Sequence, residues 1–405
     1  MTTLPNAPNA ADGTMLADTL WRHHVDPDFG AGLRDFAASM VAPHAEDIDR
    51  RDVYPVEIMK QLAARGYSTV TLDPAYGGEG RSYSHAVAVF EEISVASAAV
   101  GISLITIFQA QTMLNLFASE SLKQRYLPLF RQGLLSSYSL TEANHGSDIR
   151  RLDTKAHIDG DHWVLHGEKS FITSGSAAEF FIILAETEHG VSVFAVPRET
   201  PGITIYEGET AATFGLRNGP HMNMRLDQVR LPLDHLIGTE GKGVRQAVTV
   251  LDYSRTLAGA ISVGIARAAF EGALKFARNR IAFDKKVIDF QGIQWYFADM
   301  LTEIDASRLL IYAAADALDR HDNIARFSSE AKLKACAVAT DVASKAVQIC
   351  GAYGVTENAP FGRYLRDAKA YEIAGGSAEV LKNTIGKYLV TGLVVGNTAL
   401  GKKPS

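Results

Sequence analysis

The sequence predicts an α+β fold in three parts: an N-terminal α-helical domain, a middle β-barrel domain and a C-terminal four-helix bundle. Three observations lead to this prediction. Helical periodicity fills the chain up to about Gly133. Short runs of β-branched and aromatic residues, bounded by Gly, Asp and Pro, then extend from Ser137 to about Gly238. From about Val244 onward long helical patterns return, and four of them are long enough for an antiparallel bundle.

These changes divide the chain into five segments. We expect a flexible tail at 1–17, the α domain at 18–135, the β domain at 136–243, the helix bundle at 244–393 and a second tail at 394–405. A chain of 405 residues is too long for one simple core, which agrees with several packed domains.

The N-terminal domain is predicted from the spacing of its apolar residues. They recur every three or four positions over 29–48, and again between Pro55, which suits a first helical turn, and Gly66, which suits a helix end. Turn residues fill 73–80 before a further helix at 85–94.

Residues 93–119 carry no charged side chain and are long enough to span a bilayer. No basic cluster flanks them, and polar residues interrupt them at Ser94, Ser97, Ser103, Thr106, Gln109, Gln111, Thr112 and Asn115. We therefore expect a buried central helix and no membrane association. The N-terminus has neither a basic start nor an apolar run, so we expect no signal peptide and a cytoplasmic location.

The remaining elements follow from the same patterns. Strands are predicted at 163–167, 180–187, 191–197 and 222–232, with no helical period between them, which indicates a small barrel or sandwich. The bundle helices are predicted at 252–280, 289–320, 325–351 and 378–393.

Composition and motifs exclude several functions. A net charge of −6 and a pI near 6.1 argue against nucleic acid as the main partner. The two cysteines, Cys336 and Cys350, lack any paired spacing and are expected as buried thiols in a reducing compartment. There is no strand–GxGxxG–helix unit and no P-loop, so a nicotinamide Rossmann site is not expected. His157, His162 and His166 lie close in sequence, but a strand and turn would scatter their side chains, so no metal site is expected.

Three blocks in order, at 138–175, 251–300 and 348–389, resemble the signature blocks of acyl-CoA dehydrogenases. The resemblance runs from about residue 30 to 393. It implies a homotetramer or homodimer, with FAD extended between domains and subunits. In that family the flavin accepts a hydride from the β-carbon of an acyl thioester, carried by CoA or a carrier protein, while a carboxylate removes the α-proton. A flavoprotein or oxygen then takes the electrons.

The resemblance also implies roles for individual residues. Tyr138, Leu140 and Thr141 would border the isoalloxazine ring, and Gly146 and Ser147 would lie near the FAD pyrophosphate or the thioester. Phe171, Ile172 and Thr173 match a Trp-Ile-Thr, with the aromatic ring against the flavin and the Thr hydroxyl near N5.

More distant parts of the chain complete the implied cofactor and substrate sites. Arg280 and Phe283 would reach across a subunit interface to the neighbour's FAD. The adenosine end would be lined by Gln291, Gln348 and Gly351, and the flavin flanked by Ser377 and Glu379. Asp252 and Arg255, three apart on one helix, would line the thioester pocket.

Both positions at which the family keeps its catalytic Glu lack a carboxylate. One holds Gly375, two residues before Ser377, and the other holds Ser254, directly before Arg255. Removal of a weakly acidic α-proton needs a desolvated carboxylate, and a serine hydroxyl without a partner base does not supply one. The segment 365–380 is most similar to the isovaleryl-type branch, which uses the helix position.

Several accounts of this gap stay open. Another carboxylate can serve, with Glu372, Asp252 or a residue of the N-terminal domain as candidates. The enzyme can run other flavin chemistry on a thioester: reduction, desaturation on a carrier protein, or release of sulfite, although Ile102 stands where the sulfite-releasing branch has its Arg. The flavin can also be bound but idle in a scaffold. Flavin monooxygenases of the same fold are a further class, but they usually lose the Asp252/Arg255 and Arg366-Asp367-Ala368 patterns kept here, which favours a thioester.

Overall fold

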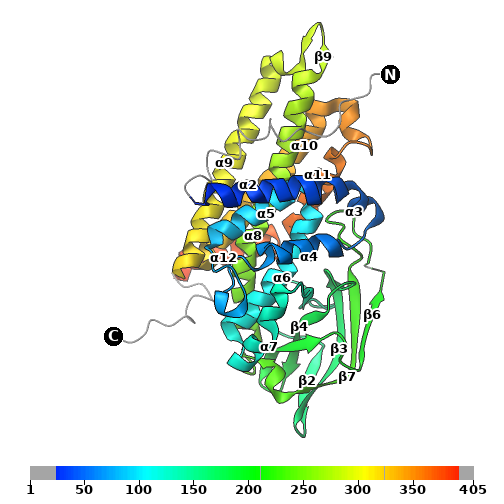
Figure 1. The fold of residues 1–405 in the computed structure, drawn as a ribbon, viewed down its shortest axis with the longest axis vertical. Coiled ribbons are helices and arrows are strands. Elements are labelled where there is room, and N and C mark those ends of the chain that lie inside the picture. The colour runs from blue at the N-terminus through cyan, green and yellow to red at the C-terminus, as the bar shows by residue number, and fades with distance from the viewer. Residues whose placement is uncertain (1–23, 210, 323, 392–405) are drawn as a thin grey trace.

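The computed structural model describes residues 24–209, 211–322 and 324–391. Figure 1 shows helices at the N-terminal part, a sheet at one end of the long axis and long helices running to the other end. The predicted tails at 1–17 and 394–405 lie outside the described residues.

Within the described residues, six α-helices form the N-terminal part: α2 (Pro27–Phe36), α3 (Ala45–Arg51), α4 (Val56–Ala64), α5 (Tyr83–Ala96), α6 (Ala98–Phe117) and α7 (Glu120–Arg131). The segment 29–48 is helical as predicted but is not one α-helix. A π turn at Ala37–Val41 and a 3-10 turn at Ala42–His44 separate α2 from α3. Pro43 has no backbone N–H, so the regular ladder cannot continue unchanged through it.

The uncharged stretch forms the end of α5 and all of α6. Ser97 has an extended backbone, with φ −158° and ψ 113°, and separates the two helices. Two helices of the described residues, Ala98–Phe117 and Gly243–Asn279, have the length and composition to cross a membrane, but 72% and 83% of their apolar windows are buried inside the protein. Such burial is typical of helices in a globular core, as predicted for this stretch.

The middle part is one eight-stranded sheet and an accompanying 3-10 turn. Its strands are β1 (Ser136–Ser139), β2 (Lys155–Asp159), β3 (His162–Ile172), β4 (Phe180–Thr187), β5 (Gly190–Pro197), β6 (Ile203–Glu207), β7 (Met222–Pro232) and β8 (Leu236–Ile237). The order is β6-β7-β3-β2-β4-β5-β8, and β1 pairs with β4 in parallel. The predicted barrel is therefore open, because β6 and β8 end the hydrogen-bonded path within the described residues.

The sheet curls around its own core. Trp163 of β3 contacts Phe194 of β5 edge-on, with ring centroids 5.3 Å apart, although β2 and β4 lie between these strands in the sheet. Strand β4 is buried on both faces: Phe181 belongs to the core of the sheet, whereas Phe180 belongs to the core shared with the helices. This alternation, period two along a strand, joins the sheet to the α domain.

The C-terminal part contains five helices: α8 (Gly243–Asn279), α9 (Gln291–Arg320), α10 (Ile324–Cys350), α11 (Phe361–Ile373) and α12 (Ala378–Thr391). Four of them match the predicted bundle, although α8 begins at Gly243 and not at 252. Helix α11 was missed, because its sequence is rich in charged residues and its apolar stripe is short. It packs against α8 and α10.

Helix α8 is the centre of the molecule, since it packs against α5, α6, α9, α10, α11 and β5. Gly264 allows its close approach to α5: a Cβ added there would lie 2.6 Å from the carbonyl oxygen of Glu91. After α8 the chain forms a two-stranded hairpin, β9 (Ile281–Ala282) and β10 (Lys285–Lys286). The hairpin projects at the end of the molecule opposite the sheet (Figure 1).

Candidate active site

The structure brings together the two segments predicted to border the flavin ring. The backbone N–H of Ser170 donates to the carbonyl oxygen of Thr141 at 2.9 Å. The Ser137 hydroxyl donates to the carbonyl oxygen of Thr173 at 2.6 Å. Segment 138–141, which continues β1, therefore lies beside the end of β3 that carries 171–173.

Phe171 has the geometry expected of a ring that contacts a ligand. It is the residue at which the pairing of β3 with β7 slips, between Lys169 and Ile172. Its φ is +54°, rare for a non-glycine residue, and its side chain is 48% exposed. Ile172, the next residue, is buried. A bulge with a strained backbone that presents an aromatic ring to the outside is typical of a functional position.

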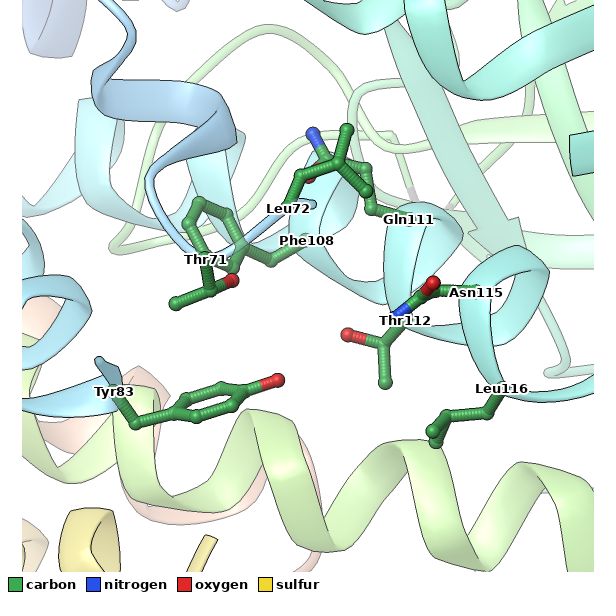
Figure 2. A pocket seen from close by; sticks show the side chains of 8 residues that line it. All are labelled: Thr71, Leu72, Tyr83, Phe108, Gln111, Thr112, Asn115 and Leu116. Atoms are coloured by element: carbon green, nitrogen blue, oxygen red, sulfur yellow. The ribbon is translucent and has the colours of Figure 1, made fainter. Parts of the chain in front are cut away.

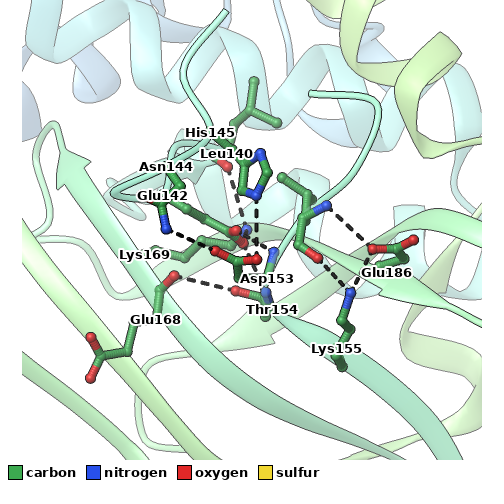
Figure 3. A network of polar contacts seen from close by, with 11 residues as sticks. Leu140, Glu142, Asn144, His145, Asp153, Thr154, Lys155, Glu168, Lys169 and Glu186 are labelled. Carbon is green, nitrogen blue, oxygen red and sulfur yellow. Dashed lines mark hydrogen bonds and ion pairs between the residues drawn. The ribbon is translucent and has the colours of Figure 1, made fainter. Parts of the chain in front are cut away.

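Sequence analysis missed a buried ion pair that fixes the loop after β1 (Figure 3). The Lys169 ammonium lies 2.6 Å from the Glu142 carboxylate, and both side chains are almost fully buried. The Glu142 carboxylate also accepts the backbone N–H groups of Asp153, at 2.5 Å, and Thr154, at 3.1 Å. The signal was available in the sequence: Lys169 falls on an inward position of a strand, where a charged residue needs a partner.

The electrostatics of this pair follow from its burial. Desolvation lowers the pKa of Lys169 to about 8, although the Glu142 carboxylate opposes the shift. Desolvation opposes ionisation of Glu142, but Lys169 and the N–H donors outweigh it, so the pKa of Glu142 is lowered. With His145 and Asp153, Glu142 forms the one group of potential metal ligands in the described part of the chain. Lys169 already supplies the positive charge there, so we assign no metal.

Gly146 and Ser147 lie in the exposed loop that follows. A Cβ added at Gly146 would meet no atom within 4 Å, so packing within the chain does not require glycine there. Their roles toward FAD or thioester stay predictions. Two of the three histidines of the sheet lie beside separate partners, His162 beside Asp161 and His166 beside Asp227.

On α8, Asp252 and Arg255 form a buried ion pair, with 2.7 Å between Oδ1 and Nη1. The Arg255 Nε also donates to the carbonyl oxygen of Gly375, at 3.4 Å. One guanidinium thus connects α8 with the loop between α11 and α12. The two positions predicted for the catalytic base, Ser254 and Gly375, are brought into one region of the molecule.

The Gly375 loop has a backbone that only glycine adopts easily. Gly375 has φ +70° and Gly376 has φ +112°. Lys332, fully buried on α10, donates to the carbonyl oxygens of Tyr371 at 3.2 Å and Gly376 at 2.8 Å. Burial lowers the pKa of Lys332. This buried lysine, which the sequence analysis did not single out, holds both sides of the loop.

Ser254 has no basic partner among the described residues. Its hydroxyl donates to the carbonyl oxygen of Leu251 at 3.1 Å and accepts from Nε2 of Gln109, on α6, at 3.3 Å. Neither partner can take its proton near neutral pH, so Ser254 does not act as a base.

Of the two candidate carboxylates named from the sequence, the structure favours Asp252. Glu372 is bonded to Lys369, one turn earlier on the partly exposed face of α11, at 2.6 Å. Asp252 is 2% exposed, and desolvation raises its pKa to about 7 in spite of Arg255. A carboxyl group with that pKa exchanges a proton near neutral pH. Ile102, at the sulfite-branch position, is buried in the core.

Ser377 directly precedes α12, and Glu379 lies in its first turn. The carbonyl oxygen of Ser377 accepts the N–H of Leu381 at 3.0 Å, which makes Ser377 the cap residue of this helix. Glu379 is exposed. Their contacts with a flavin stay predictions.

The motif Arg366-Asp367-Ala368 joins domains. Arg366 binds Asp49 of α3 at 2.5 Å and donates to the carbonyl oxygen of Phe214 at 2.6 Å. Asp367 is buried and accepts the N–H of Leu216 at 2.6 Å. The motif therefore fixes α11 against α3 and the loop before β7, and no thioester contact is needed to explain it.

The other residues predicted to bind FAD lie at the far end of the bundle (Figure 1). Arg280 ends α8, Phe283 is the 90% exposed tip of the β9–β10 hairpin, and α9 starts at Gln291. Gly351 begins the 3-10 turn Gly351–Val355, and Gln348 lies just before this turn. Tyr353 of the turn stacks on Phe276 of α8, with ring centroids 5.6 Å apart. This second group lies apart from the first, which sits where the end of β3 meets α6.

The residues of both groups fit a flavin dinucleotide. Phe171 and Phe283 present exposed aromatic faces, and the Tyr138 hydroxyl is buried without a hydrogen-bond partner. Arg280 supplies an exposed guanidinium suited to a pyrophosphate. Flat apolar surfaces with a few unpaired polar groups are what an isoalloxazine ring and its phosphates need.

Comparison with known proteins agrees with this geometry. Three family models match: the acyl-CoA dehydrogenase N-terminal domain over residues 28–133, the middle domain over 137–229 and the C-terminal domain over 241–390. A probable acyl-CoA dehydrogenase of Mycobacterium leprae is 33% identical over 368 residues, which cover 89% of this chain and 94% of that protein. An acryloyl-CoA reductase (NADH) of Anaerotignum propionicum is 35% identical over 363 residues, covering 87% and 91%.

Among solved structures, butyryl-CoA dehydrogenase from Megasphaera elsdenii superposes with a TM-score of 0.87 at 32% identity, covering 90% of this chain and 97% of that one. The α–β–α order, the paired flavin-edge segments and these matches over nearly the whole chain agree with one another. The chain is therefore a member of the acyl-CoA dehydrogenase family of flavoprotein oxidoreductases, which act on CH–CH groups.

Proposed function

We propose that this protein is an FAD-dependent oxidoreductase that acts on an acyl thioester of CoA or a carrier protein, with Asp252 in place of the missing glutamate. The observation that carries the proposal is the buried Asp252–Arg255 pair, bonded through Arg255 to the Gly375 loop. It provides a desolvated carboxyl group on the helix that carries Ser254, and Arg255 connects this group to the loop of Gly375.

The first group of residues would hold the flavin ring, with Phe171 against its face and the segment 138–141 along its edge. The cofactor supplies hydride acceptance from, or donation to, the substrate β-carbon. The chain would supply orientation: the Lys169–Glu142 pair fixes the loop after β1, Lys332 holds the Gly375 loop, and Arg255 connects that loop to Asp252.

In the oxidative direction, the Asp252 carboxylate takes the α-proton while the hydride leaves the β-carbon. Arg255 keeps the carboxylate oriented and stabilises its charged form. Because desolvation raises the pKa of Asp252 to about 7, the group is ionised enough at neutral pH to accept a proton and basic enough to use it.

Reduction of an enoyl thioester is the second candidate. A carboxyl group with a pKa of about 7 is protonated in about half of the molecules at neutral pH, so it can equally donate the α-proton. A relative with 35% identity is an acryloyl-CoA reductase. The two directions require opposite protonation states of Asp252, so their pH profiles differ.

The assembly and its partners are also proposals. The separation of the two FAD-binding groups supports a homotetramer or homodimer with cofactor sites shared between chains. The electron partner would be a flavoprotein or oxygen, with the protein in the cytoplasm.

Anaerobic titration of the FAD-loaded protein with short, branched and aromatic acyl-CoAs tests the function. Bleaching of the flavin absorbance by one of them is the expected result for dehydrogenation. Reoxidation of photoreduced flavin by an enoyl-CoA, without bleaching by any saturated thioester, would establish the reductase instead. Failure of both reactions while thioesters still perturb the spectrum would reject the proposed chemistry.

A further inference from the structure

Three polar residues form a stripe on the largely buried helix α6. Ser103, Thr106 and Gln109 are spaced three apart, so they lie along one side of the helix. Each bonds a polar side chain of a different segment: Ser103 accepts from Asn218 at 2.9 Å, Thr106 donates to Ser174 at 3.2 Å and Gln109 donates to Ser254 at 3.3 Å.

The stripe contacts residues next to the predicted flavin and substrate sites. Ser174 comes directly after the segment 171–173 predicted to lie against the flavin, and Ser254 directly precedes Arg255. Ser254 stands at the helix position where the resemblance places the catalytic glutamate, and Gln109 donates to its hydroxyl. The side of the site that faces α6 is therefore lined by neutral donors and acceptors.

Polar groups around the stripe have unused hydrogen-bonding capacity. Within the described residues, Asn218 Oδ1 and the Ser176 hydroxyl are buried without a partner. They lie close together, because a Cβ added at Gly219, the residue after Asn218, would meet Ser176 Oγ at 3.1 Å. Buried polar atoms are normally paired, so this cluster needs a further partner to satisfy it.

A small cavity, partly lined by polar side chains, lies about one turn beyond Gln109 along α6 (Figure 2). Its volume is about 30 Å³, and Thr112 and Asn115 of α6 line it together with Tyr83 of α5. The Tyr83 ring contacts that of Tyr253, the neighbour of Ser254, with centroids 5.5 Å apart. The space is enough for one water-sized polar group.

The α6 side of the site offers no charge to an ionised substrate group. Residues 93–119 contain no charged side chain. A carboxylate or ammonium group on the acyl chain would be desolvated here without a partner.

We infer that the acyl group accepted by this protein carries an uncharged hydrogen-bonding group, such as a hydroxyl, that Gln109 and Ser254 recognise. The inference rests on the proposed function, since it assumes a thioester substrate. It makes Gln109 a specificity-determining residue. A site that hydrogen-bonds a substrate hydroxyl rejects the analogue without it, because its own polar groups are then left unpaired.

The test compares two thioesters of the same size, 4-hydroxybutyryl-CoA and pentanoyl-CoA, by their dissociation constants for the FAD-loaded protein, measured anaerobically from the flavin spectral shift. We expect the hydroxyacyl thioester to bind at least about 10-fold more tightly. In Gln109→Leu the preference should disappear or reverse. Gln124→Leu, an exposed glutamine of α7, is the matched control and should keep it.

Equal or tighter binding of pentanoyl-CoA by the unchanged protein would overturn the inference, as would an unaltered ratio in Gln109→Leu with FAD retained. The dissociation constants need no turnover, so a hydroxyl preference without flavin bleaching would leave the inference standing and reject only the proposed chemistry. No spectral shift with either thioester would overturn both.

Discussion

At the scale of single residues, Asp252 has the most direct consequence for chemistry. Asp252→Asn keeps the size of the side chain and removes its basicity. We expect the rate of flavin reduction by a saturated substrate to fall by at least about 100-fold, with the thioester spectral shift retained. Stopped-flow absorbance measures both quantities. Loss of binding together with the rate would mean that Asp252 only supports the fold.

The pH dependence of the reaction rate also tests the assignment of Asp252 as the proton-transferring group. The pKa of Asp252 is raised to about 7, so the carboxylate form that accepts a proton gains population as pH rises through that value. Dehydrogenation should therefore speed up between about pH 6 and 8 and then level off, whereas enoyl reduction should slow over the same interval. A flat profile in single-turnover measurements would speak against Asp252 in either direction.

A glutamate introduced at Ser254 should cost less stability than one introduced at Gly375. Ser254→Glu lies within a helix and only has to displace Gln109, whereas Gly375→Glu puts a side chain at φ +70°, which costs about 1–2 kcal/mol. We predict that Ser254→Glu gains at least about 10-fold in dehydrogenation of isovaleryl-CoA and that Gly375→Glu gains less. Dye reduction measures the rates. No gain in either variant, with FAD retained, would show that the pocket has also changed shape.

Lys169 and Glu142 illustrate how a buried pair depends on both members. Lys169→Met leaves the Glu142 carboxylate buried beside two N–H donors but without its cation. We expect a loss of about 3–5 kcal/mol in unfolding free energy from urea denaturation. The double variant Lys169→Met/Glu142→Gln should recover part of it, because no buried charge is left. Equal losses in the two variants would contradict this explanation.

At the scale of secondary-structure elements, a buried ion network joins α5, α8 and α9. Arg267 of α8 contacts Glu91 at 2.9 Å and Glu92 at 2.7 Å, and Arg308 of α9 contacts Glu91 at 2.7 Å. All four side chains are at most 5% exposed. The network fixes the angle at which α8, and with it Asp252, crosses the N-terminal domain.

Removing the shared acid should be costly. Glu91→Ala leaves two buried guanidinium groups with fewer partners, and we predict a loss of about 3–5 kcal/mol in unfolding free energy. The exposed pair Arg320–Asp316 on α9 is the control, since Asp316→Ala should cost less than about 1 kcal/mol. Similar losses in the two variants, measured by denaturant titration, would refute a special role of the network.

At the scale of the whole molecule, the predicted FAD residues form two separate groups, one where the end of β3 meets α6 and one at the end of the bundle that carries the β9–β10 hairpin (Figure 1). We predict that Arg280→Ala lowers FAD affinity by about 10-fold or more without unfolding the protein, because a pyrophosphate loses a bidentate partner. FAD occupancy from absorbance measures this. The control is Arg278→Ala, an exposed neighbour at the same helix end. Light scattering should give a mass above the 43.8 kDa of one chain, and a monomer that keeps FAD would contradict the shared site.

Much of this architecture could be predicted from the sequence, because local patterns carry it. The strands at 180–187 and 222–232 match β4 and β7, and the helices after Gly243 follow the predicted order. Local patterns failed where the signal was weak or interrupted: α11 has too short an apolar stripe, and Pro43 divides the first helix. The sequence did not show that the barrel is open, because strand pairing between distant segments leaves no mark in either segment alone.

For the site, the sequence by itself determined the residue types, the flavin-edge motifs and the absence of a carboxylate at Ser254 and Gly375. Only the tertiary structure decided which groups meet: Glu142 with Lys169, Gln109 with Ser254, and Arg255 with the Gly375 loop. The physical reason is that a motif fixes spacing along the chain, whereas burial, pKa and hydrogen bonding depend on neighbours that folding brings from distant segments.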